Sequence, residues 1–300
     1  MQILRTTGNE IRRILCSTGF WIAVGLALII LLTSTAYEEE DGTTHTVLAF
    51  AFEYSKDQML IYNQDLQSQF AIVRYALPMY GPLLAALAFA STLCEERKYG
   101  VRRYIVFQEG RVPYVLSKAF SACLASGLVF FISALLFLLF LYWRYPLRSA
   151  GEMDSFLYWM EYQSVSPNGE PIVWFEWFGE HAFCILQLAG TFLYGMFSGF
   201  IGYICTIFFS NVYLAVCIPF FFGYIYYSIT QAIMARAMEG SISWDVYNAI
   251  NSYVSPEGYM YFWRMADSFV VNMVVLLLVW VIAIGIHMLQ IHKTTDCGVK

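Results

Sequence analysis

The sequence predicts an all-α integral membrane protein that crosses the bilayer six times. Of its 300 residues, 59% are hydrophobic and only 13% are charged, whereas soluble globular chains are about 45–50% apolar and about 25% charged. The chain also contains long runs without Asp, Glu, Lys or Arg, and a bilayer core about 30 Å thick needs about 20 apolar residues per helix. Its basic residues, finally, are segregated along the chain as they are between the two sides of a membrane.

The six predicted spans are the uncharged runs of the sequence. The run between His181 and Arg236 holds 54 residues, which is too many for one helix. We expect it to fold into two helices at Ser210–Asn211, the most polar and turn-prone point near its middle. Prolines inside the second and fifth spans are tolerated in membrane helices. The spans are 18–37, 74–93, 119–143, 184–208, 212–235 and 268–290.

The distribution of charge predicts the orientation. Eleven of the 17 Lys and Arg residues lie in the N-terminal segment, in 94–118 and in the C-terminal tail, whereas 17 of the 22 acidic residues lie in the other connections. Because basic residues concentrate on the cytoplasmic side, both termini and segment 94–118 are expected in the cytoplasm. Segments 38–73 and 144–183 are then extracytoplasmic loops of a single transmembrane domain. This topology requires the first span to remain, so it is not expected to be a cleaved signal peptide.

Several classes of function are disfavoured by what the sequence lacks. A net charge of −5 without a basic patch argues against nucleic-acid binding. No span interior carries Asp, Glu, Lys or Arg, which ion-coupled transporters usually need at membrane depth. There is no phosphate-binding loop, no HExxH and no CxxC, and Gly100 stands where an EExxxR membrane protease needs its Arg. We therefore expect no catalytic site, cofactor or metal in this chain.

Segment 94–118 is longer than a simple connection between two spans needs to be. Within it, Val101, Tyr104 and Ile105 have the i, i+3, i+4 spacing of one helix face, and charged residues alternate with them. Gly100 and Gly110 bracket this stretch. The pattern predicts a short amphipathic helix, which can lie on a bilayer or insert into a groove of a cytoplasmic partner.

This segment resembles the same region of permease subunits of ABC type-2 (ABC-2) transporters. In that family a Glu and a Gly follow the second span, and a short coupling helix leads through a turn with Pro and Arg to a Lys that enters the third span. The matching positions here are Phe89, Glu95 or Glu96, Gly100, Pro113 and Lys118, together with Arg111, which precedes rather than follows the proline.

The rest of the chain resembles that family in layout. Residues 9–15 resemble its amphipathic interface helix, Ser210–Asn211 its tight link between spans four and five, and 236–267 its outer loop of short re-entrant helices. The resemblance thus implies six transmembrane helices with an amphipathic N-terminal interface helix, a cytoplasmic coupling helix between spans two and three, and short re-entrant helices before span six.

The resemblance also implies a function and partners. The chain would be the permease of an exporter in the cell membrane, in a bacterium the inner membrane, and would form half of a path for an amphiphilic substrate such as a drug, lipid or peptide. It would have no nucleotide-binding domain, pair with a second permease (identical or related), and bind separate cytoplasmic ABC ATPase subunits that hold ATP and magnesium. The residues assigned to ATPase coupling are Glu95, Glu96, Tyr99, Gly100, Arg102, Arg103, Tyr104, Phe107, Arg111 and Lys118, and those of the interface helix are Glu10, Arg12 and Arg13.

Other interpretations of the same residues stay open. The chain could be a non-transporting membrane scaffold or sensor whose outer loops bind an extracytoplasmic ligand. The acidic pair 95–96 could form only local pairs with the bases of 97–103, and those bases could serve only to orient the chain. Gly195 and Gly199 have the small-xxx-small spacing of close helix packing within the chain, or of a subunit interface or substrate path. The aromatic run 220–227 is either core and lipid-facing surface or the lining of a substrate path.

Overall fold

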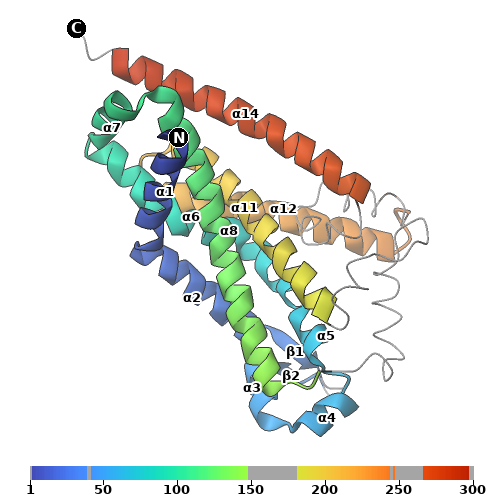
Figure 1. The fold of residues 1–300 in the computed structure, drawn as a ribbon. Helices are drawn as coiled ribbons and strands as arrows, with labels where there is room; N and C mark the ends of the chain where they lie inside the picture. The colour runs from blue at the N-terminus through green and yellow to red at the C-terminus, as the bar shows by residue number, and fades with distance from the viewer. Residues whose placement is uncertain (1, 39–41, 148–180, 244–245, 247–265, 297–300) are drawn as a thin grey trace.

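The computed structural model of the chain describes residues 2–38, 42–147, 181–243, 246 and 266–296. Four long helices form a bundle: α2 (Thr18–Thr33), α6 (Val73–Lys98), α8 (Arg111–Arg144) and α11 (Ala182–Phe208). Two further long helices, α12 (Val212–Met238) and α14 (Ala266–Asp296), lie along its side (Figure 1). The short helices α1 (Gln2–Leu15) and α7 (Val101–Glu109) lie at one end of this bundle, beside the C-terminal end of α14 (Figure 1).

The helices have the length and composition of a membrane protein. Four of them, α6, α8, α11 and α12, are long and apolar enough to cross a bilayer. The pair α1 and α2, bent by 62°, would add a fifth span if it is counted as one. Within the described part of α14, the apolar stretch Trp280–His292 is shorter than a span. A mainly helical membrane protein is therefore confirmed, and the first and sixth spans stay predictions.

Several observed helix ends differ from the predicted span boundaries: α6 continues to Lys98 rather than ending at 93, and α8 begins at Arg111 rather than at 119. The turn at Ser210–Asn211 is confirmed, because α11 ends at Phe208 and the Asn211 side chain accepts a hydrogen bond from Tyr213 N at 2.9 Å, which caps α12. The first span does not reach residue 37, since α2 ends at Thr33 and strand β1 (Thr35–Glu38) pairs antiparallel with β2 (Thr44–Thr46). Thr and Tyr favour this extended backbone, and hydropathy alone does not detect it.

The end of the bundle opposite α7 carries a folded unit where the sequence predicted the loop 38–73 (Figure 1). After the hairpin come α3 (Val47–Glu53), α4 (Lys56–Ile61) and α5 (Leu66–Phe70), and each is capped at its N-terminus by a polar side chain. Rings from the hairpin and these helices pack together at centroid distances of 4.5–6.2 Å: Tyr37, Phe50, Tyr54 and Tyr62. Most of the predicted loop 144–183, and the predicted re-entrant helices before span six, lie outside the described residues.

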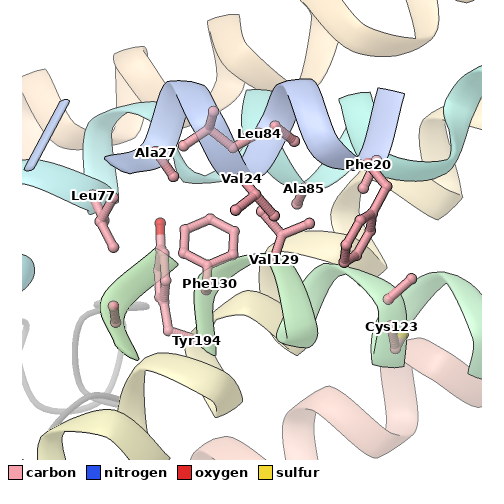
Figure 2. Close-up of a cluster of buried hydrophobic side chains, with 14 of the residues drawn as sticks. Phe20, Val24, Ala27, Leu77, Leu84, Ala85, Cys123, Val129, Phe130 and Tyr194 are labelled. Atoms are coloured by element: carbon pink, nitrogen blue, oxygen red, sulfur yellow. The ribbon is translucent and has the colours of Figure 1, made fainter. Parts of the chain in front are cut away.

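The core of the bundle is built from interleaved large and small side chains. Figure 2 shows rings of α2, α8 and α11, namely Phe20, Phe130 and Tyr194, packed among aliphatic and small residues of α2 and α6. Helices α8 and α11 approach most closely at glycines. A Cβ placed on Gly195 would lie 2.9 Å from the Ser126 carbonyl oxygen, and one on Gly199 would lie 2.5 Å from Ser126 Cβ. The prediction that these glycines serve close helix packing is confirmed.

Candidate functional site

The predicted short helix between spans two and three exists as α7, with the two glycines at its ends. Gly100 precedes it with φ +70° and Gly110 follows it with φ +84°. Backbone at positive φ favours glycine, which has no Cβ to clash. These two turns set α7 apart from the end of α6 and the start of α8, so that it projects at the end of the bundle (Figure 1).

One face of α7, with the turn before it, carries exposed aromatic rings. The side chains of Phe107 and Tyr104 in α7 are 93% and 76% exposed, Tyr99 in the preceding turn is 70% exposed, and Arg103 is exposed as well. The opposite face packs inward through Val106, with Ile105 and Arg102 half-buried. Within the part of the chain that the structure describes, no element covers the exposed rings, which is unusual for aromatic side chains unless a membrane or a partner meets them.

Behind α7, buried charges join three helices. Glu96, at the end of α6, is 3% exposed. Its carboxylate accepts hydrogen bonds from Lys118 Nζ at 2.5 Å, from the Tyr114 hydroxyl at 3.2 Å and from the Arg13 guanidinium. Lys118 Nζ also lies 2.5 Å from Glu10 Oε2 as an ion pair. We call Glu10, Arg13, Glu96, Tyr114 and Lys118 the Glu96 cluster.

The Glu96 cluster fixes the position of α1. Thr6, Glu10 and Ile14 share one face of this helix, and all three are buried against the bundle. Buried charges are tolerated only when they are paired, because ions are costly to remove from water. Since Glu10 pairs with Lys118 of α8 and Arg13 pairs with Glu96 of α6, α1 cannot move away without leaving its own Glu10 unpaired.

The predicted coupling residues thus separate into two groups. Glu96 and Lys118 are buried and meet Glu10 and Arg13 of the predicted interface helix, whereas Glu95 and Arg12 are exposed. The interpretation in which Glu96 pairs locally with bases of 97–103 is wrong about its hydrogen-bond partners, which come from α1 and α8. The sequence predicted no tertiary partner because those residues are distant along the chain.

Other predicted bases tie neighbouring helices to this end of the bundle. Arg111 lies 2.6 Å from Nδ1 of His292, which joins the start of α8 to the end of α14. Arg97 donates to the carbonyl oxygen of Ile207 at 3.0 Å, one of the last carbonyls of α11, where a cation also interacts favourably with the helix dipole. These contacts give both bases a structural role besides orientation in a membrane.

The inner side of α7 shifts the titration of two groups. Burial, reinforced by the nearby charge of Glu10, raises the pKa of Glu109, while a hydrogen bond with Thr6 acts in the opposite direction. Burial lowers the pKa of Arg102, and the neighbouring charge of Arg97 lowers it further. Both side chains are half-buried, in contrast to the exposed rings on the outer face.

Tyr114 is a member of the cluster that sequence reasoning missed. It is buried, and its hydroxyl completes the donors around Glu96. Its spacing of four residues from Lys118 places both side chains on the same face of α8, which is the signal that could have identified it. His287 is buried and lies 2.6 Å from the Tyr203 hydroxyl, which ties α14 to α11.

The described residues contain no group of three His, Cys, Asp or Glu side chains that could hold a metal. Comparison of the chain with protein-family models, with curated proteins and with solved structures finds no match. A functional interpretation therefore depends on the geometry of α7 and of the cluster behind it.

Proposed function

We propose that this chain is the permease subunit of an ATP-driven ABC-type exporter. In this proposal α7, together with α1, binds separate cytoplasmic ABC ATPase subunits. The observation that carries the proposal is the exposed aromatic and basic face of α7, together with the buried charges of the Glu96 cluster that lie behind this helix. An exposed patch of large rings is typical of a docking site, and the arrangement of parts matches the ABC-2 resemblance of segment 94–118.

The Glu96 cluster supplies a physical route for coupling. A partner that displaces α7 would act on the end of α6 and the start of α8, because only two residues separate α7 from α6 and one separates it from α8. Because Glu96 and Lys118 are joined to each other and to α1, the displacement would move these helices as a unit. Rigid-body motions of this kind are a common way to switch a site between two states.

A second permease and an amphiphilic substrate belong to the same proposal. Helix α12 carries a broad exposed apolar surface, which includes Phe221, Phe222 and Ile225. Lipid, a second copy or a related permease would cover such a surface in a membrane. The position of α1, α7 and the C-terminal end of α14 at one end of the bundle agrees with the predicted cytoplasmic location of both termini (Figure 1).

The test is purification of the tagged chain from its native host in a mild detergent. We expect an ATPase with a phosphate-binding loop to co-purify, and the double variant Tyr104→Ala/Phe107→Ala to lose it while still inserting into the membrane. The matched control is Tyr213→Ala, which removes a ring of 80% exposure from α12 and should keep the partner.

Two results would contradict the proposal. One is a chain that purifies without an ATPase, which would favour the alternative of a non-transporting scaffold or sensor. The other is an ATPase that remains bound at full stoichiometry when both rings of α7 are removed.

A further inference from the structure

A cavity of about 340 Å³ lies between α6, α11 and α12. This volume is in the range of small-molecule sites, which are about 300–1,000 Å³. Its walls contain no charged side chain. Prolines of α6 form one side, and Phe197, Phe222 and Tyr227 are among the rings of α11 and α12 that form the others.

The cavity exists because α6 and α12 both depart from regular packing at this height. Pro82 has no N–H, so the carbonyl of Pro78 loses its helical partner. The Tyr194 hydroxyl donates to that carbonyl at 3.0 Å, and Figure 2 shows this side chain reaching from α11 towards Leu77 of α6. On α12, a Cβ at Gly223 would lie 2.9 Å from Pro82 Cγ. The two helices therefore touch at this glycine, and the cavity lies beside the contact.

One polar group in the wall lacks a partner. Ser198 is fully buried, and its Oγ makes no hydrogen bond within the described part of the chain. Buried serines in a helix usually donate to a carbonyl of the preceding turn, and Ser117, Ser121 and Ser133 of α8 do so. A buried hydroxyl without a partner is costly, and a ligand in the cavity could supply the missing partner.

We propose that this cavity binds a neutral, flat, mostly apolar ligand of the polycyclic aromatic class, whose single oxygen substituent hydrogen-bonds to Ser198. The ligand is neutral because a charge would lose its hydration without gaining a counter-ion. It is flat because aromatic rings in the walls favour stacked or edge-on contact with another ring. The site is built by one chain, so it goes beyond the proposed function and needs neither an ATPase nor a second permease.

The test uses the purified full chain in lipid nanodiscs with two probes, anthracenemethanol and methylanthracene. The probes share one ring system and differ only in the hydroxyl. Energy transfer from the tryptophans of the protein reports binding. Nanodiscs without protein measure how much probe partitions into the lipid, which rises linearly with probe concentration. The saturable signal that remains after this contribution is subtracted measures binding to the site. We expect saturable binding of one probe molecule per chain.

Variants then assign the site. Ser198→Ala should lower the affinity for anthracenemethanol about 3- to 10-fold, which corresponds to the loss of one hydrogen bond. The affinity for methylanthracene should stay unchanged. The matched control Ser133→Ala removes a buried hydroxyl that has a partner outside the cavity and should change neither probe. Ile201→Trp should fill the cavity and abolish the saturable binding of both probes. Its control Ile229→Trp, at an exposed position of α12, should leave the binding of both probes intact.

Three results would overturn the proposal. Absence of saturable binding by the wild-type chain, or wild-type affinity in Ile201→Trp, would reject the site. An equal effect of Ser198→Ala on both probes would reject the role of its hydroxyl. Should Ile201→Trp fail to fold, the comparison of the two probes in Ser198→Ala remains as the test. Since the chain is measured alone, failure to find an ATPase partner leaves this result intact.

Discussion

Two contacts hold the bundle together by different means. The α8–α11 contact (Ser126, Gly127, Gly195 and Gly199) depends on shape, because the backbones approach where no side chain fits. The Glu96 cluster depends on charge, because Glu10, Glu96 and Lys118 are buried and need counter-ions, while Arg13 pairs with Glu96 from a partly exposed position. The first is the kind of contact expected to hold a rigid span, and the second can respond to a partner, to pH or to salt.

The largest expected effect comes from removing one charge from the cluster. Lys118→Met leaves Glu10 and Glu96 buried without their shared cation, and breaking a buried ion pair in this way costs about 3–5 kcal/mol. Chemical denaturation of the purified chain in detergent measures the loss. The matched control is Lys98→Met, since Lys98 is exposed at the end of the same helix that carries Glu96. Equal stability of the two variants would show that the cluster does not hold α1 in place.

The next effect tests the contact that depends on shape. A Cβ at Gly195 meets backbone atoms of α8, which cannot rotate away, so Gly195→Ala should cost about 1–3 kcal/mol. Gly25→Ala in α2 is the matched control, because a Cβ there has nothing within 4 Å. Alanine is the better helix former by about 1 kcal/mol, so the control should be neutral or stabilising. A Gly195→Ala chain as stable as its control would mean that the two helices are further apart than described.

The same two contacts show how much of the structure the sequence can predict. The Ser210–Asn211 turn and the spacing of Gly195 and Gly199 are local patterns, and both predicted their features correctly. Uncharged length located the long helices but not the end of the first one at Thr33. The Glu96 cluster is not local, since Arg13 and Glu96 are 83 positions apart. Whether Glu95 or Glu96 faces inward depends on the rotation of α6, which packing against α1 and α8 determines and which the neighbouring residues do not encode.

A smaller effect is expected at an exposed hydrogen bond. The Arg111 guanidinium donates to Nδ1 of a neutral His292 and joins α8 to α14 at the surface, and such a bond contributes about 0.5–1.5 kcal/mol. Arg111→Ala should therefore lower the melting temperature only slightly, and by a similar amount at low and high salt, because the contact is not an ion pair that salt would screen. Arg12→Ala is the control, as Arg12 is also exposed. A loss as large as that of Lys118→Met would place Arg111 in the same class as the buried charges.

The smallest effect concerns pH and distinguishes the two sides of α7. Because the folded chain raises the pKa of Glu109, it holds that proton more tightly than the unfolded chain does. The contribution of this group to stability is therefore greatest below the ordinary carboxyl pKa and is lost as the pH rises through the raised value. The Gln side chain of Glu109→Gln stays neutral at every pH, so this variant does not lose stability as the carboxyl group ionises. Its melting temperature should therefore rise relative to that of the wild type as the pH increases through this window. The exposed Glu95→Gln should show no such gain. A difference between wild type and Glu109→Gln that does not vary with pH would mean that water reaches the inner face of α7, and that face would then be no better shielded than the aromatic one.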